Sequence, residues 1–196
     1  NSNNGTTTGH INLNGGTLSS ALLISGGNLQ GADHILSGPV TWTAGNIRGA
    51  ASTTVASTLV ISGAGNKGLS GGRVLNTTNT TTWSGNTAAN NNAIVFSGSG
   101  TINNSGSWSD TNAFASYMQD FTGTNAFNNT ATGIFSKQGS AITTMEVVYN
   151  NSGTTNANAG RFRMTGGGTS NGNFNVANGA VLDFNYGTHN LDAASI

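Results

Sequence analysis

The sequence contains no cysteine, a single proline and very few charges. Without cysteine, neither disulfide bonds nor thiolate metal sites contribute to the fold. Only 6 % of the residues are charged, and six basic and six acidic side chains give a formal net charge of zero. Because binding to nucleic acid and to anionic membranes depends on clustered basic side chains, we expect neither as a partner.

Long hydrophobic runs are also missing. No stretch approaches the roughly 20 apolar residues of a membrane-spanning helix, so we expect no membrane insertion. Glycine and asparagine interrupt nearly every window that is long enough for a helix. The chain is nevertheless 35 % hydrophobic, whereas disordered chains usually combine low hydrophobicity with high net charge. The apolar residues therefore indicate an ordered fold.

Most of these apolar residues favour β-structure. They occur in short runs such as HINLN, LLIS, VTWT, LVIS and VLDF, which Gly and Asn clusters separate. In these runs the inward and outward positions alternate, because successive side chains of a strand point to opposite faces. The sequence predicts an all-β protein.

The runs belong to repeats. Segment 22–31 (LLISGGNLQG) aligns without gaps to segment 40–49 (VTWTAGNIRG), and segment 59–71 repeats the theme with an insertion. Further along, an apolar residue followed by Asn recurs at a somewhat longer spacing. The starts of these later repeats are Leu75, Ile102, Phe127, Tyr149 and Phe174. A period of about 18–27 residues is typical of one coil of a β-solenoid.

Residues 1–196 are therefore predicted to form a single β-solenoid segment, a right-handed parallel β-helix with coils of about 18–27 residues. It would be part of a longer repeat array or a subunit that stacks. The alignment predicts one inward column of side chains in the core. Its members are Ile24, Trp42, Ile61, Trp83 and Trp108. The alternative for the three Trp residues is an exposed platform that stacks on sugars.

Asn–Asn pairs recur at one point of the later coils. The second residues of these pairs, Asn104, Asn129 and Asn151, are predicted to form a ladder, because stacked identical amides hydrogen-bond along the axis. The alternative is a polar binding face. The segment 110–122 is ambiguous, since Phe114, Tyr117, Met118 and Phe121 have helical spacing inside β surroundings; we expect irregular or strand structure there.

The candidates for chemistry are sparse. Asp33 and His34 are adjacent, so a strand would send their side chains to opposite faces, and no His pair has metal-ligand spacing. The six acids are widely spaced, and Arg161 and Asp183, one coil apart, suggest an exposed ion pair between coils. We therefore expect no catalytic residues, no metal and no cofactor. Few ionisable groups also predict a weak dependence of stability on salt and on pH between about 5 and 9.

Neither end shows the polar or helical cap that solenoid arrays carry. Leu191 and Ile196 continue the apolar pattern to the last residue. We expect these residues to take part in end-to-end stacking, either on neighbouring repeats of the same chain or on other copies.

Four strings carry a resemblance: VTWTAGNIRG, KGLSGGRVLNTTNTTTWSGN, FNNTATGIFSKQG and FRMTGGGTSNGNFNVANGAVLDFNYGTHNLDAASI. They resemble the repeat regions of large secreted bacterial surface proteins, similar to filamentous-haemagglutinin and autotransporter-like adhesins. The resemblance covers nearly the whole chain through low-complexity patterns, and it implies a right-handed β-helix displayed at the cell surface.

Three functions follow as expectations. The first is a non-enzymatic structural or adhesive segment of an extracellular or cell-surface protein, which forms a rigid rod or a fibre subunit. The second is a glycan-binding β-helix module that contacts a host or cell-surface ligand. The third is a fragment of a polysaccharide-degrading enzyme, since parallel β-helices also host such enzymes.

Overall fold

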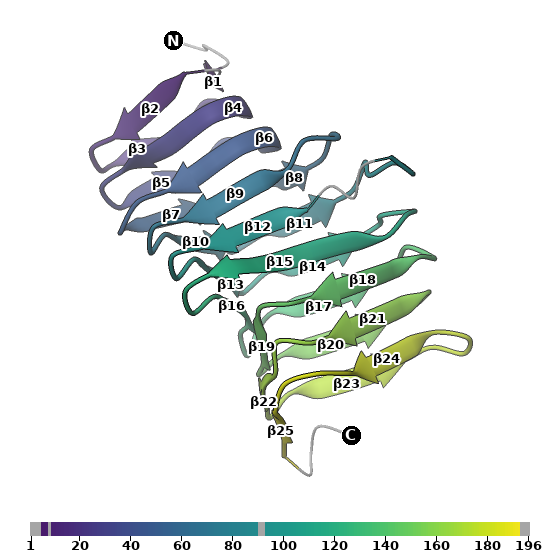
Figure 1. Ribbon diagram of the computed structural model, residues 1–196. Helices are drawn as coiled ribbons and strands as arrows, with labels where there is room; N and C mark the ends of the chain where they lie inside the picture. Colours follow the sequence, from purple (N-terminus) through teal and green to yellow (C-terminus); the bar gives the residue numbers. More distant parts are fainter. Residues whose placement is uncertain (1–4, 8, 90–92, 193–196) are drawn as a thin grey trace.

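The chain forms a parallel β-solenoid of about eight turns, with about 22 residues in each coil (Figure 1). The computed structural model describes residues 5–7, 9–89 and 93–192, and these residues contain strands and no helix. Each strand pairs in parallel with the equivalent strand one coil away. The predicted fold class, an all-β parallel solenoid, is confirmed.

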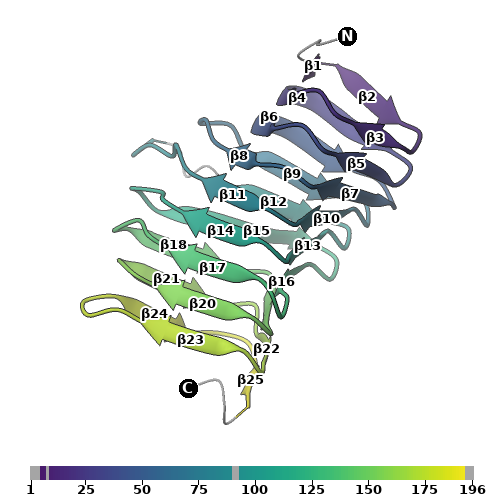
Figure 2. The same cartoon turned by 180° about the vertical axis from the view of Figure 1, so that it is seen from behind.

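Each coil has three strand-bearing faces, here called the first, second and third face. Figure 2 views the molecule from behind and has the first face toward the viewer. It consists of β1 (Gly5–Thr7), the first parts of β4 (Leu22–Gly31) and β6 (Val40–Arg48), β8 (Leu59–Ile61), β11 (Thr80–Trp83), β14 (Ser107–Asp110), β17 (Ile134–Lys137), β20 (Thr154–Ala157) and β23 (Asn173–Val176).

The second face lies toward the viewer in Figure 1 and joins the first through β4 and β6, which cross from one to the other. It consists of β2 (His10–Leu13), the second parts of β4 and β6, β9 (Lys67–Ser70), β12 (Ile94–Ser97), β15 (Ser116–Thr122), β18 (Ile142–Met145), β21 (Arg161–Met164) and β24 (Val181–Phe184).

The third face is a separate nine-stranded sheet. It consists of β3 (Thr17–Leu18), β5 (His34–Leu36), β7 (Ser52–Val55), β10 (Val74–Thr77), β13 (Thr101–Asn104), β16 (Ala126–Asn129), β19 (Val148–Asn151), β22 (Gly168–Ser170) and β25 (His189–Leu191).

The strand register gives the length of each coil. On the first face Leu22 pairs with Val40, which closes a short coil, and Thr81 pairs with Trp108, which closes a long one. Both pairings agree with the predicted range of coil lengths. Coils of different length stack because most strands are three or four residues long and the turns between them take up the extra residues.

The predicted alignment of one repeat is wrong. It makes Phe174 the successor of Tyr149, but Phe174 lies on the first face in β23, where it pairs with Thr155. The third face continues instead through Ser170, which pairs with Asn151. Two positions before Ser170 the chain has Gly168, so the apolar residue that marks the repeat is missing from this coil.

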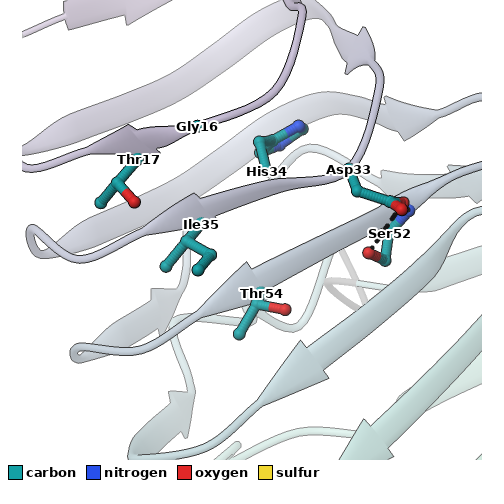
Figure 3. Close-up of a pocket in the computed structure, with 7 residues that line it drawn as sticks. All are labelled: Gly16, Thr17, Asp33, His34, Ile35, Ser52 and Thr54. Carbon is teal, nitrogen blue, oxygen red and sulfur yellow. Dashed lines mark hydrogen bonds between the residues drawn. The ribbon is translucent and has the colours of Figure 1, made fainter.

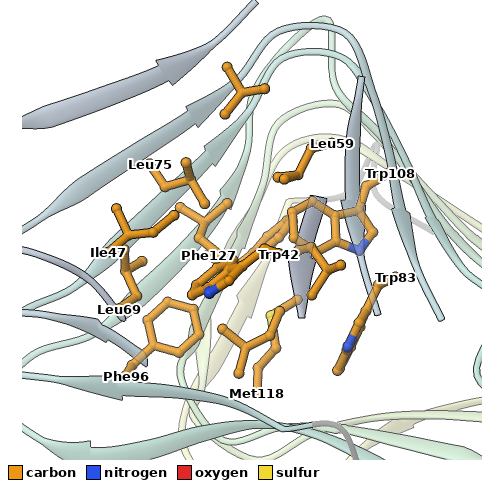
Figure 4. Close-up of a cluster of buried hydrophobic side chains, with 14 of the residues drawn as sticks. Trp42, Ile47, Leu59, Leu69, Leu75, Trp83, Phe96, Trp108, Met118 and Phe127 are labelled. Carbon is orange, nitrogen blue, oxygen red and sulfur yellow. The ribbon is translucent and has the colours of Figure 1, made fainter. Parts of the chain in front are cut away.

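The core is a continuous stack of inward side chains from the three faces (Figure 4). Two inward columns run along the first face, and we name each after its first residue. The Ile24 column contains Ile24, Trp42, Ile61, Trp83, Asp110, Lys137, Ala157 and Val176. The Leu22 column contains Leu22, Val40, Leu59, Thr81, Trp108, Phe135, Thr155 and Phe174.

Trp108 corrects the predicted core column. Ile24, Trp42, Ile61 and Trp83 share one column, whereas Trp108 pairs with Thr81 and lies in the Leu22 column beside it. Trp83 pairs with Asp110. Trp108 lies two positions before Asp110 and therefore pairs with Thr81, which lies two positions before Trp83. A shift of two keeps the side chain inward, because the strand period is two.

The ambiguous segment 110–122 contains no helix. Ser116–Thr122 forms β15, in which Met118 is inward and pairs with Ile94 and Met145. Phe114 and Phe121 are exposed, so the helical spacing of the four apolar residues does not describe one buried face.

Candidate functional surfaces

The second asparagines of the Asn–Asn pairs, Asn104, Asn129 and Asn151, form an inner asparagine row; they are the last residues of β13, β16 and β19 on the third face. The Asn104 amide donates to Asn129 Oδ1, and the Asn129 amide donates to Asn151 Oδ1, both at 2.9 Å. The three side chains are at most 1 % exposed. This row is closed to external ligands and acts inside the fold.

Each inner asparagine also fastens a neighbouring strand. The second N–H of the side chain donates to the carbonyl of the first residue in a first-face strand of the next coil. These acceptors are Ile134, Thr154 and Asn173, at 3.2, 2.9 and 3.1 Å from Asn104, Asn129 and Asn151 respectively. The row thus joins the third face of one coil to the first face of the next. Each amide N–H gives a backbone carbonyl a hydrogen bond in place of the water that the carbonyl would bind if it were exposed.

The register explains where this row begins and ends. The same column holds Leu36 and Val55 in earlier coils, and Thr77 then donates its hydroxyl to Asn104 Oδ1 at 3.1 Å. At the other end Asn151 reaches Ser170 Oγ at 3.5 Å, and Ser170 pairs with Leu191. Of the two residues predicted to stack at the end, Leu191 is half-buried in β25, and Ile196 lies outside the described residues.

A second ladder, which sequence reasoning missed, lies on the outer side of the same strands. This outer asparagine row consists of Asn76, Asn103, Asn128 and Asn150, with amide-to-amide distances of 3.0, 2.8 and 2.9 Å. All four are half-buried. The signal was available, because the first asparagine of each pair must point opposite to the second. The row is a linear array of uncharged hydrogen-bonding groups at the surface.

The three tryptophans are fully buried, in the interior shown in Figure 4. A sugar-stacking platform needs exposed ring faces, so these residues cannot provide one. The exposed aromatic side chains of the described residues are Phe114, Phe121, Phe184 and Tyr186, which lie in other parts of the coils.

Asp33, His34 and Ser52 line a shallow pocket on the third face (Figure 3). The Asp33 carboxylate accepts from the backbone N–H and hydroxyl of Ser52 at 2.7 and 2.9 Å, and these bonds lower the pKa of Asp33. His34 is buried; its Nδ1 lies 2.9 Å from Ala32 O and its Nε2 3.1 Å from Thr53 Oγ1. The Ser52 hydroxyl therefore donates to the Asp33 carboxylate, whereas the His34 ring contacts Ala32 and Thr53.

Two side chains of opposite charge lie inside the solenoid. Asp110 and Lys137 pair in register on β14 and β17, and both are fully buried. The Asp110 carboxylate accepts from Asn112 and Thr143, and Lys137 Nζ donates to Gly139 O. Burial raises the pKa of Asp110 and lowers that of Lys137, and the charge of each partner opposes the shift of the other. Both side chains are closed to solvent.

Two more buried cations hold backbone carbonyls. Lys67 Nζ donates to Gly63 O at 3.0 Å and Gly65 O at 2.6 Å, and burial lowers its pKa to about 8. This pKa lies near the upper end of the range over which the sparse charges predict little pH dependence, so Lys67 is a group from which a change of stability is expected there. Arg73 joins several coils through carbonyl oxygens. Its acceptors are Arg48, Ser52 and Gly31, at 3.0, 3.2 and 3.3 Å.

Arg161, Arg163 and Asp183 form an ion-pair cluster on the outside of the second face. Asp183 Oδ2 lies 3.0 Å from Arg161 Nη1 and 2.9 Å from Arg163 Nε. The two guanidinium groups hold the pKa of Asp183 below its usual value, chiefly through the hydrogen bond from Arg163. Such exposed pairs stabilise a fold only weakly.

The coil formed by β23, β24 and β25 leaves inward positions uncovered. Val176 is 49 % exposed and Phe184 is 37 % exposed. One coil earlier their register partners, Ala157 and Met164, are fully buried. Val176 and Phe184 are more exposed than their partners because, among the described residues, only one coil packs against the coil of β23, β24 and β25.

No metal site or membrane span emerges from the described part of the chain. Within it, no three His, Asp or Glu side chains gather as metal ligands, and no helix has the length and apolar character of a membrane span. Searches against family models, curated proteins and solved structures found no match to this chain. The β-solenoid architecture is shown, and the resemblance to bacterial adhesins stays a prediction.

Proposed function

We propose that this chain is a non-enzymatic rod segment of an extracellular or cell-surface protein. Support comes from the way each coil is fastened to the next by parallel ladders, the inner asparagine row and a continuous core. None of these features presents reactive groups to a substrate. Together they would make a stiff spacer with a formal net charge of zero, which carries the parts of the protein attached to it.

The observation that carries this proposal is the uncovered coil of β23, β24 and β25. Val176 and Phe184 occupy positions that are core in the preceding coil, and a parallel strand placed over them would continue both the ladder and the core. That next coil comes from neighbouring repeats of the same chain or from a second copy. Self-association through this edge, including the predicted contact of Leu191, is therefore part of the proposal.

Sedimentation velocity and electron microscopy of the isolated chain test it. We expect elongated oligomers that Val176→Lys disperses, because a charge then faces the apolar edge. Ile35→Lys is the matched control, since Ile35 is 43 % exposed but lies on the outer side of the third face. A monodisperse wild-type monomer at high concentration would contradict stacking, as would an equal effect of both substitutions.

A second candidate function, glycan binding, is favoured by the outer asparagine row. Within this row Asn103 and Asn128 each give one N–H and one oxygen lone pair to neighbouring amides, which leaves further groups for sugar hydroxyls. A glycan array distinguishes the two functions. Binding that is lost in Asn103→Ala and retained in Asn175→Ala, an exposed amide of the first face, would establish a glycan-binding module.

A further inference from the structure

Asparagine followed by glycine is prone to a spontaneous reaction. The glycine backbone nitrogen attacks Cγ of the asparagine, the new N–C bond closes a succinimide, and the side-chain nitrogen leaves as ammonia. Water then opens the ring at either carbonyl, which yields aspartate or isoaspartate. Glycine permits the attack because it lacks a side chain and its backbone turns freely. The reaction needs water only, and the surrounding structure decides whether the nitrogen can reach Cγ.

The sequence contains four such pairs, Asn4–Gly5, Asn14–Gly15, Asn171–Gly172 and Asn178–Gly179. Asn4 lies outside the described residues. The other three occupy turns in different structural settings, so they form a natural comparison within one chain.

Asn178–Gly179 lies in the turn that joins β23 to β24. Ala180 N donates to Ala177 O at 3.0 Å across this turn, and both Asn178 and Gly179 are exposed. Gly179 has a φ of 83°, and a Cβ built on it would meet nothing within 4 Å. Among the described residues no acceptor binds the Gly179 N–H. The nucleophile and its target are therefore free to approach each other.

Asn14–Gly15 has the same properties. It lies between β2 and β3, and both residues are exposed. Gly15 has a φ of 101°, and the nearest atom to a Cβ built there is Asp33 O at 3.7 Å. The described residues again offer no acceptor for the Gly15 N–H.

Asn171–Gly172 is held by the stack of coils. The backbone N–H groups of Asn171 and Gly172 donate to Asn151 O at 3.1 and 2.9 Å. Gly172 is buried, and a Cβ on it would lie 2.3 Å from Gly153 O of the preceding coil. Rotation of Gly172 N toward Cγ would break its hydrogen bond to Asn151 O and disturb the packing against Gly153.

We propose that Asn14 and Asn178 are modification sites that convert to aspartate and isoaspartate in the folded protein, whereas coil stacking protects Asn171. Each conversion adds one negative charge to a chain whose formal net charge is zero. The charge of the protein therefore changes with its age, in a protein whose surface carries few other charges.

The test is incubation of the folded chain in mildly alkaline buffer, followed by peptide mass spectrometry and isoaspartate detection. We expect conversion at Asn14 and Asn178, with Asn171 slower by about tenfold or more, because a hydrogen-bonded segment opens in only a small fraction of molecules. In denaturant the three sites react at similar rates. Asn178→Gln, which slows ring closure, removes one acidic step from the ion-exchange profile of the folded chain.

Two results would overturn the proposal. One is conversion of Asn171 as fast as Asn178 in a chain whose circular dichroism shows it to be folded. The other is an unchanged Asn178 in the folded chain although the same residue reacts in denaturant.

Discussion

Replacement of Asn129 by alanine tests whether the inner asparagine row holds the coils together. Asn129 accepts from Asn104 and donates to Asn151 Oδ1 and to Thr154 O, each at 2.9 Å. Three hydrogen bonds at about 1 kcal/mol each account for about 3 kcal/mol, and the buried oxygens left without donors add to this loss. We expect Asn129→Ala to lower the free energy of unfolding by about 3–5 kcal/mol.

Asn128→Ala is the matched control, because Asn128 lies next to Asn129 on β16 and carries the same amide. It donates to Asn103 at 2.8 Å and accepts from Asn150 at 2.9 Å, but it is half-buried on the outer side. Water replaces lost hydrogen bonds there, so we expect a loss of about 1 kcal/mol or less.

Urea unfolding followed by circular dichroism measures both losses. Hydrogen exchange of the amides in β13, β16 and β19 locates them, because coils of a repeat protein can unfold separately. Equal losses for the two variants would refute the reasoning, since the expected difference arises from burial and not from the amide itself. A loss confined to Asn128→Ala would refute it more strongly.

Two further predictions concern the core. Trp42→Ala removes a fully buried ring whose Nε1 donates to Gly45 O at 3.2 Å, and we expect a loss of about 3–5 kcal/mol in urea unfolding; a loss below about 1 kcal/mol would contradict the packing. Lys67 has a folded pKa of about 8 against an ordinary value of 10.5, so the unfolded state binds more protons between these values and stability rises with pH there. We expect this rise in thermal melts of the wild type and a smaller one in Lys67→Met, and an identical pH profile for the two chains would show that Lys67 is not the cause.

Local features of the sequence were sufficient for the type of fold and for the direction of many side chains. Alternation with period two is a property of each strand by itself, so Ile24 and Trp42 could be placed inward without knowledge of their neighbours. The recurrence of similar segments indicated the coil length, because each coil repeats the same structural unit. The same alternation would have revealed the outer asparagine row and the buried charges, since Asp110 and Lys137 lie two positions after the inward Trp108 and Phe135.

Only the tertiary structure decided how the coils are aligned with one another. Turns absorb insertions without a sequence signal, so the column of Trp108 and the face of Phe174 depended on strand pairing across the stack. The environment of each polar group was decided there too. Asn171 and Asn178 differ in backbone restraint because the preceding coil binds the backbone at Asn171 and Gly172 and leaves the turn at Asn178 free of such bonds among the described residues. In a solenoid, the direction of a side chain follows from its own strand, whereas strand register and the burial of the side chain depend on the stacking of coils.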